Sequence, residues 1–323
     1  MSMKTFRRLL LLGLFPLTGC HTVLMAPSGD LAIQQRNLII DSLILMLLIV
    51  VPVIVMALLF AWHYRAGNKK ASYDPDWDHS TMLELLIWSA PLLIIIALGA
   101  LTWVSTHKLD PFRPLDRIAA GRPVPADAKP LQVDVVALDW KWLFIYPEQN
   151  IAVVNELAAP VDRPIQFHIT ASTVMNSFFI PALAGQIYAM PGMETQLQAV
   201  INKPGEFNGF SANFSGDGFS HMNFVFHGLS EDAFAQWVQK AKAGGGELSR
   251  DEYVKLAAPS EQVPVHYYAG VAPNLFMAIM GNCVPEGSAC MNNKAAAPAG
   301  GEEGAAVPAH GADSMAAMPM AHP

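Results

Sequence analysis

The sequence predicts a membrane-anchored, all-β protein, in which a two-helix transmembrane hairpin precedes a β-sandwich with short C-terminal helices. Three observations predict this fold: two long runs without charge, a series of short alternating segments, and a low charged fraction overall. The chain has 323 residues, of which 52% are hydrophobic and 15% are charged, whereas a soluble globular domain has about 25% charged residues. Apolar sequence must therefore be concentrated where water does not reach.

Two apolar runs account for much of the missing charge. Ser42 to Trp62 and Leu85 to Thr106 contain no ionisable side chain, and about 20 residues suffice for a helix to cross a hydrocarbon core. Pro52 and Pro91 lie inside these runs. Proline is tolerated in membrane helices when neighbouring helices satisfy the freed backbone groups, so both spans are expected to pack on a larger partner.

The orientation of the hairpin follows from its loop. Residues 63–80 connect the two spans and contain Arg65, Lys69 and Lys70. Basic loops stay in the cytoplasm. Both ends of the hairpin, and everything that follows residue 106, are therefore expected on the outer side of the membrane.

The N-terminus has the pattern of a secretion signal. Lys4, Arg7 and Arg8 precede a short apolar stretch that ends in Leu17-Thr18-Gly19-Cys20. This tetrapeptide resembles a bacterial lipobox, which implies that the thiol of Cys20 is lipidated and that residues 1–19 are removed. Loss of three basic residues takes the net charge from −7 to −10. A plain buried cysteine is the alternative interpretation.

The outer portion begins with a Pro-rich connector, residues 107–130, expected to be irregular. Beyond it, apolar and polar residues alternate with the period of a half-buried strand, as in Ile165, Phe167 and Ile169. Several such runs predict an antiparallel β-sandwich. The runs are Leu131 to Leu138, Trp140 to Tyr146, Pro164 to Thr170, Thr195 to Ile201, Phe207 to Phe214 and Met222 to His227.

Two helices and a low-complexity tail complete the chain. Ser230 is expected to begin one helix, and Ser249, followed by Glu252, has the pattern of a capping box that begins another. Residues 292–323 are rich in Ala, Gly and Pro, which predicts a disordered tail. The apolar face of the first helix is Phe234, Trp237, Val238 and Ala241.

Taken together, these features resemble subunit II of a heme-copper respiratory oxidase, from about residue 17 to 277. Residues 84–91 resemble the start of that family's second helix, and residues 139–146 its aromatic strand. Residues 174–181 and 190–192 fall where the family has its copper-domain loops. The resemblance implies a cupredoxin-type Greek-key sandwich.

The expected organisation has nine parts. They are a signal peptide (1–19), an outer N-terminal segment (20–37), the first span (38–62), a cytoplasmic loop (63–80), the second span (81–106), a linker (107–130), a cupredoxin-like domain (131–229), a helical extension (230–291) and the tail (292–323).

The residues at the family's copper positions differ from those that copper requires. In cytochrome c oxidases this domain carries a binuclear copper centre with two bridging thiolates, two imidazoles and a methionine sulfur, since soft ligands suit copper. Only the methionine remains here, so the resemblance implies a vestigial site and no metal in this chain. The positions are Ser211 and Ser215 for the thiolates, Asn176 and Phe219 for the imidazoles, Asn213 for a glutamate, and Met222.

That pattern resembles the ubiquinol-oxidase branch of the family, the cytochrome bo type. It implies a non-catalytic subunit of a proton-pumping complex that oxidises ubiquinol and reduces dioxygen. Heme b, heme o and copper would lie in the partner subunit I, with smaller subunits III and IV and membrane lipid around them. Nucleic acid is not expected as a partner, because the net charge is −7. Cytochrome c is not expected either, because the resemblance implies that the copper relay is absent. The implied location is the bacterial inner membrane, with the large domain in the periplasm.

Five further residues carry individual expectations. Glu84 lies where the family has the mouth of a proton-uptake path, with an interfacial carboxylate as the alternative. Trp140 and Trp142 are interpreted as strand packing. Cys283 and Cys290 are seven residues apart with Pro and Gly between them, which favours a disulfide in an oxidising compartment. Three cysteines in all are too few for a disulfide-dense scaffold or a four-thiolate metal site.

A different class of function stays open at this point. The chain would then be a membrane-anchored, cupredoxin-like copper carrier outside an oxidase, using His and Met side chains of the tail. A replacement metal site at His221, Met222 and His227 is disfavoured, because six residues along one strand separate the two imidazoles by about 20 Å. The tail residues are His310, Met315, Met318, Met320 and His322.

Overall fold

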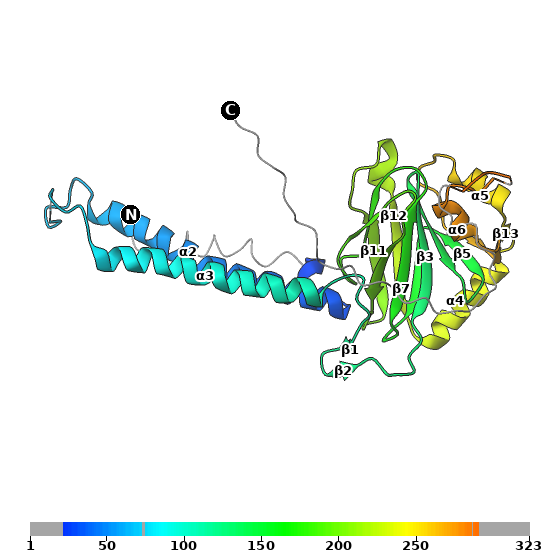
Figure 1. The fold of residues 1–323 in the computed structure, drawn as a ribbon, viewed down its shortest axis with the longest axis horizontal. Helices are drawn as coiled ribbons and strands as arrows, with labels where there is room; N and C mark the ends of the chain where they lie inside the picture. Colours follow the sequence, from blue (N-terminus) through cyan, green and yellow to red (C-terminus); the bar gives the residue numbers. More distant parts are fainter. Residues whose placement is uncertain (1–21, 73–74, 286, 291–323) are drawn as a thin grey trace, which may run out of the picture.

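The computed structural model describes residues 22–72, 75–285 and 287–290. A long pair of helices leads into a β-rich domain, and short helices cover the far side of that domain (Figure 1). The fold class predicted from the sequence is confirmed. The lipidation predicted at Cys20 and the tail from residue 292 lie outside the described residues.

The hairpin consists of α2 (Asp30–His63) and α3 (Thr81–Lys108), which run side by side (Figure 1). Both are long and apolar enough to cross a membrane. Pro52 and Pro91 lie inside the helices, and the large apolar side chains point outward into the surroundings. Such surfaces are stable only against lipid or other apolar helices.

Helix α2 begins earlier than the expected span, because its first turns dock on the β domain. Its start is preceded by Ser28 and Gly29, whose amides donate to the carbonyl of Ala182 at 2.9 and 2.8 Å. Asp30 is buried, and its carboxylate accepts from Arg117 Nε at 2.8 Å and from Gln34 Nε2 at 2.7 Å. These contacts fix the helix to the domain outside the apolar run.

The connector contains one regular element that the sequence interpretation missed. Strands β1 (Arg117–Ala119) and β2 (Arg122–Pro123) pair as a short hairpin, in which Gly121 has φ 75°. Ion pairs hold it: Arg117 contacts Asp30, and Arg122 donates twice to Asp162 at 2.8 and 3.0 Å. The expectation of an irregular connector is therefore wrong here, because distant carboxylates order the segment.

The β domain is a sandwich of two sheets. The six-stranded sheet has the order β10-β7-β3-β4-β5-β14, and the five-stranded sheet has the order β6-β12-β11-β8-β9. The strands are β3 (Leu131–Leu138), β4 (Lys141–Tyr146), β5 (Ile151–Val154), β6 (Glu156–Pro160), β7 (Ile165–Ala171), β8 (Asn176–Phe179), β9 (Ile187–Ala189), β10 (Thr195–Ala199), β11 (Gly205–Ser211), β12 (Asn223–Leu229) and β14 (His266–Tyr268).

The sandwich is not purely antiparallel, contrary to the expectation. Strands β3 and β7 pair in parallel, and so do β12 and β6. Between β3 and β7 the chain forms the β4–β5 hairpin of the same sheet and then contributes β6 to the other sheet. Parallel neighbours need such a long connection, and here the crossing between sheets provides it.

Two hydrophobic cores lie on opposite faces of the six-stranded sheet. The first fills the sandwich and contains Trp142, Phe144, Phe178 and Phe224. The rings of Phe178 and Phe224 are stacked, with centroids 5.5 Å apart and an interplanar angle of 3°. The second core lies between the outer face of this sheet and the C-terminal segments.

Three helices follow the sandwich: α4 (Glu231–Ala243), α5 (Arg250–Ala257) and α6 (Leu275–Met280). The hydroxyls of Ser230 and Ser249 cap the first two, accepting from backbone amides at 3.2 Å. These caps and the buried face of α4 confirm the sequence predictions, whereas α6 was not predicted. Strands β13 (Glu247–Leu248) and β15 (Gly270–Val271) pair between the helices.

The junction of hairpin and sandwich gives a testable prediction. Arg117→Leu leaves the buried carboxylate of Asp30 without its cationic partner, so we expect the free energy of unfolding in detergent to fall by about 1–3 kcal/mol. Arg113→Leu is the matched control, because its pair with Asp116 is exposed on both sides and contributes about 0–1 kcal/mol. Equal losses of unfolding free energy in the two variants would contradict a stabilising role for the pair of Asp30 and Arg117.

Candidate functional site

Three of the six residues singled out by sequence meet at the end of two neighbouring strands. Asn176 begins β8 and Ser211 ends β11, and both are buried. The Ser211 hydroxyl donates to Asn176 Oδ1 at 3.0 Å, and the Ser211 amide donates to the carbonyl of Met222 at 3.2 Å. Met222 is 1% exposed and belongs to the sandwich core. Their polar groups are therefore hydrogen-bonded to one another.

Asn213 joins the same group from the loop. Its side-chain amide donates to the carbonyl of Met175 at 3.2 Å, and its own carbonyl lies 3.2 Å from Ser211 Oγ. Asn176 in turn donates to the carbonyl of Val174 at 3.2 Å. Amide and hydroxyl groups thus tie the loop before β8 to the loop after β11.

Ser215 and Phe219 are not joined to this group by hydrogen bonds. The Ser215 hydroxyl is buried and has no hydrogen-bond partner among the described residues. Phe219 packs edge-on against Phe214, which is 74% exposed. The structure therefore brings four of the six positions together and leaves these two further along the loop.

Trp140 holds that further part of the loop, a role that the sequence interpretation missed. It was expected to pack within a strand, but it lies in the turn before β4 with φ 65°. Its indole Nε1 donates to the carbonyl of Ser215 at 3.0 Å. The indole also lies against the backbone of Gly216 and Gly218, and a Cβ atom at Gly218 would come within 2.5 Å of it. Only the two glycines let the loop approach so closely.

The side chains of the site do not fit a binuclear copper centre. Two hydroxyls, two amides, a phenyl ring and one thioether offer neither a thiolate nor an imidazole, and copper of this kind needs those ligands. No group of three or more His, Cys, Asp or Glu side chains that could hold a metal ion occurs among the described residues. Hydrogen bonds between uncharged groups join Asn176, Ser211 and Asn213 instead.

The two histidines near the loop are also separate. They were expected on one strand, but His221 ends a 3₁₀ helix, η3 (Asp217–His221), and only His227 lies in β12. The His221 ring is 3.2 Å from Glu261, and the His227 ring is 3.9 Å from Glu156. Each therefore has its own carboxylate neighbour.

Two carboxylates of the hairpin lie on its surface. Glu84 is in the first turn of α3, exposed, with Oε1 2.8 Å from His79 Nδ1. Asp41 lies on α2 beside a shallow apolar groove formed with α3. Neither is enclosed within this chain.

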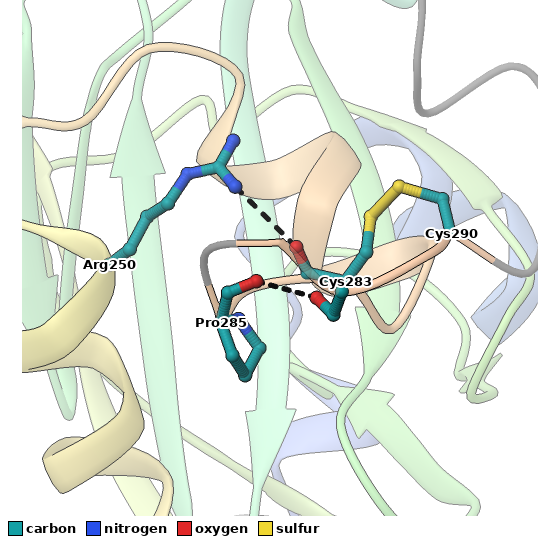
Figure 2. Close-up of a disulfide and its surroundings, with 5 residues drawn as sticks. Arg250, Cys283, Pro285 and Cys290 are labelled. Carbon is teal, nitrogen blue, oxygen red and sulfur yellow. Dashed lines mark hydrogen bonds between the residues drawn. A yellow bond between two sulfur atoms is a disulfide. The ribbon is translucent and has the colours of Figure 1, made fainter.

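Cys283 and Cys290 are joined by a disulfide after α6, as Figure 2 shows. Cys283 is buried in the second core, and its carbonyl accepts from Arg250 Nη1 at 3.5 Å. Within the loop, the Ser288 hydroxyl donates to the carbonyl of Pro285 at 2.6 Å. The bridge therefore ties Cys290 back to Cys283, which follows α6 in the second core.

Lys141 is a further residue that the sequence did not single out. It is fully buried, yet its Nζ donates to the carbonyl of Ala258 at 2.8 Å and to Ser260 Oγ at 2.5 Å. Burial lowers the pKa of the Lys141 amine. These bonds attach β4 to the segment after α5.

Comparison with known proteins agrees with this architecture. The family model for the periplasmic domain of cytochrome c oxidase subunit II matches residues 126–229. The chain is 51% identical, over 87% of its length and 88% of the relative's, to cytochrome bo(3) ubiquinol oxidase subunit 2 of Pseudomonas putida. The chain belongs to the ubiquinol oxidase subunit 2 family. The copper-carrier alternative is not favoured.

A further relative and a solved structure are also similar to this chain. Ubiquinol oxidase subunit 2 of Acetobacter aceti is 49% identical over 82% of this chain and 83% of its own length. A crystal structure of the periplasmic domain of subunit II of cytochrome oxidase of Bradyrhizobium japonicum is 24% identical, covering 37% of this chain and 96% of that chain, with a TM-score of 0.35.

The family's second model extends the resemblance found from sequence. The COX Aromatic Rich Motif matches residues 242–287, ten residues beyond the limit of 277 drawn from sequence. The matched range contains α6, Cys283, and the two residues that accept hydrogen bonds from Lys141, Ala258 and Ser260. The segment that covers the second core is therefore part of the family fold.

The hydrogen bonds of the site give the second prediction. Ser211→Ala leaves Asn176 Oδ1 buried without its donor, so the free energy of unfolding should fall by about 1–3 kcal/mol. Ser215→Ala is the matched control: it removes the same atom, but a buried hydroxyl without a partner among the described residues, and should leave stability unchanged or raise it. Chemical denaturation of both variants measures the difference, and a larger loss in the control would refute it.

Proposed function

We propose that the chain is subunit 2 of a proton-pumping ubiquinol oxidase, and that its cupredoxin domain has lost the binuclear copper centre. The observation that carries this proposal is the donor set at the former copper loops. Ser211, Asn176 and Asn213 hydrogen-bond to one another, and Met222 alone offers a soft ligand. Without a copper relay, the domain has no path for electrons from a soluble donor.

The overall reaction explains why the relay is dispensable. Two ubiquinol molecules give four electrons and four protons to one dioxygen, yielding two ubiquinones and two water molecules. Ubiquinol dissolves in the membrane, so it can deliver electrons to heme in the large subunit without passing through the outer domain. The relatives' names as ubiquinol oxidase subunits support this assignment.

In this proposal the chain supports assembly of the complex and covers the periplasmic side of subunit I, and it does not transfer electrons. Heme b, heme o and copper would be carried by subunit I, and subunits III and IV would complete the complex. The apolar surfaces of α2 and α3 are suited to pack on subunit I within the membrane. The sandwich would cap subunit I on the periplasmic side.

The proposed topology follows from three features. Lipidated Cys20 would anchor the mature N-terminus in the outer leaflet, and the basic loop with Arg65, Lys69 and Lys70 would face the cytoplasm. The β domain follows α3 and so would lie in the periplasm of the inner membrane.

Purification through this chain in mild detergent tests the function. We expect a heme-bearing partner to co-purify and the preparation to oxidise ubiquinol but not reduced cytochrome c. Recovery of the chain without heme, or turnover with reduced cytochrome c, would contradict the proposal.

Glu84 is proposed to lie at the mouth of a proton-uptake path into subunit I. It is at the loop end of α3, beside His79, on the side from which protons are taken up. Glu84→Gln should slow ubiquinol oxidation by about tenfold if proton delivery limits turnover. Asp78→Asn, at an exposed carboxylate of the same loop, should leave turnover unchanged; equal rates in all three proteins would exclude the role.

A further inference from the structure

A group of titratable side chains lies far from the former copper loops, on the outer face of the six-stranded sheet. Asp134 of β3 and His168 of β7 are directly opposite each other in the parallel pair. His168 Nδ1 is 2.5 Å from Glu194 Oε1, and its Nε2 is 2.9 Å from Gln132 Oε1. The imidazole is therefore held between two elements and faces two carboxyl groups.

This group forms one wall of a cavity of about 520 Å³. The opposite wall is residues 271–277, the segment that leads into α6 and belongs to the aromatic-rich motif. That wall presents Leu275, Phe276 and Met277 and has no charged side chain. The polar group thus shares the cavity with a segment that cannot neutralise it.

The remaining charged group at the cavity is Glu148, in the turn after β4. Its Oε2 is 3.6 Å from Arg163 Nη2, so an arginine balances it. Gln132 and Asn274 are the uncharged polar neighbours from β3 and from the covering segment. Proton binding is therefore governed by Asp134, His168 and Glu194.

The protonation of these groups is linked to burial. The pKa of Asp134 is raised to about 7, chiefly by burial; the charge of His168 lowers it and the charge of Glu194 raises it. The hydrogen bond that the His168 imidazole donates to Glu194 raises the pKa of His168, against the effect of burial. Asp134 and His168 therefore bind protons more tightly in the folded domain than in the unfolded chain.

We propose that Asp134, His168 and Glu194 form a proton-binding site on the outer face of the domain, and that its occupancy sets how firmly residues 271–277 seat on the sheet. When the covering segment lifts, Asp134 regains water and loses its proton more readily. Seating and proton binding therefore favour each other.

The direction of the pH dependence follows from these shifts. A carboxyl whose pKa is raised in the folded state contributes most stability below its unfolded pKa of 3.8, and that stability falls as the pH rises through about 7. The His168 contribution is complete below 6.5 and is lost as the pH rises through its raised folded pKa. Asp134, whose shift is caused chiefly by burial, therefore makes the segment firmest at acidic pH, whereas the bond between His168 and Glu194 stabilises the folded domain at acidic pH independently of the segment.

The physiological meaning rests on the proposed function. An oxidase that pumps protons outward acidifies the side on which this domain would lie. The site would then hold the aromatic-rich segment most firmly when the enzyme is most active. The proton-binding site itself needs only the geometry above.

Hydrogen exchange measured by mass spectrometry on the purified complex tests the proposal. The observable is the opening of residues 271–284 between pH 5.5 and 8.5, corrected for the intrinsic exchange rate. We expect opening to increase about tenfold up to pH 7.5, since each unit of pKa difference corresponds to tenfold. Asp134→Asn should remove most of this increase.

Two further variants keep the test specific. Glu194→Gln lowers the pKa of Asp134 and should move the increase to lower pH, whereas His168→Gln should move it to higher pH, because Glu194 and His168 act on Asp134 in opposite senses. Asp127→Asn, at an exposed site, is the matched control and should resemble the unmodified protein.

Two outcomes would overturn the site: pH-independent opening in the unmodified complex, or an unchanged pH profile in Asp134→Asn. Ubiquinol oxidation is measured on the same preparations. Loss of oxidase activity with the pH profile intact would count against the proposed function alone, so the two failures are distinguishable.

Discussion

The aromatic core between the two sheets is the interaction on which the outer domain depends. Phe178 and Phe224 of the five-stranded sheet stack on each other, and Trp142 of the six-stranded sheet packs edge-on against both at 5.4 and 5.7 Å. Phe178 is two residues from Asn176, and Phe224 is two residues from Met222. Core packing therefore fixes the strands that carry the site, and such packing, at about 25 cal/mol per Å² of buried apolar surface, needs no metal.

Short polar contacts then complete the loops. The hydroxyl of Ser211, the amides of Asn176 and Asn213, and the indole of Trp140 form hydrogen bonds in the two loops where we propose that a copper centre has been lost. Because buried polar groups are stable only when hydrogen-bonded, this network explains how the loops keep their conformation with these residues. The fold and the electron relay are thus separable, which the proposed direct use of ubiquinol requires.

Much of this could be predicted from sequence, and the exceptions have physical causes. Strand β3 and the capped helices α4 and α5 carry strong local patterns, so they were predicted closely. Strands β5 and β6 lack alternation because nearly every residue in them is buried, and α6 has only six residues. The β1–β2 hairpin and the turn at Trp140 depend on partners distant in sequence, Asp30, Asp162 and Gly218, which no local pattern reveals. The outcome at Cys20 lies outside the described residues.

Copper analysis of the intact complex, combined with its optical spectrum, tests the central claim most directly. If the outer domain keeps its fold through packing and hydrogen bonds and has lost the relay, the only copper should be that of the heme-bearing partner subunit. The oxidised complex should show no mixed-valence copper absorption. Two additional copper atoms per copy of this chain, with a purple mixed-valence spectrum, would contradict the account.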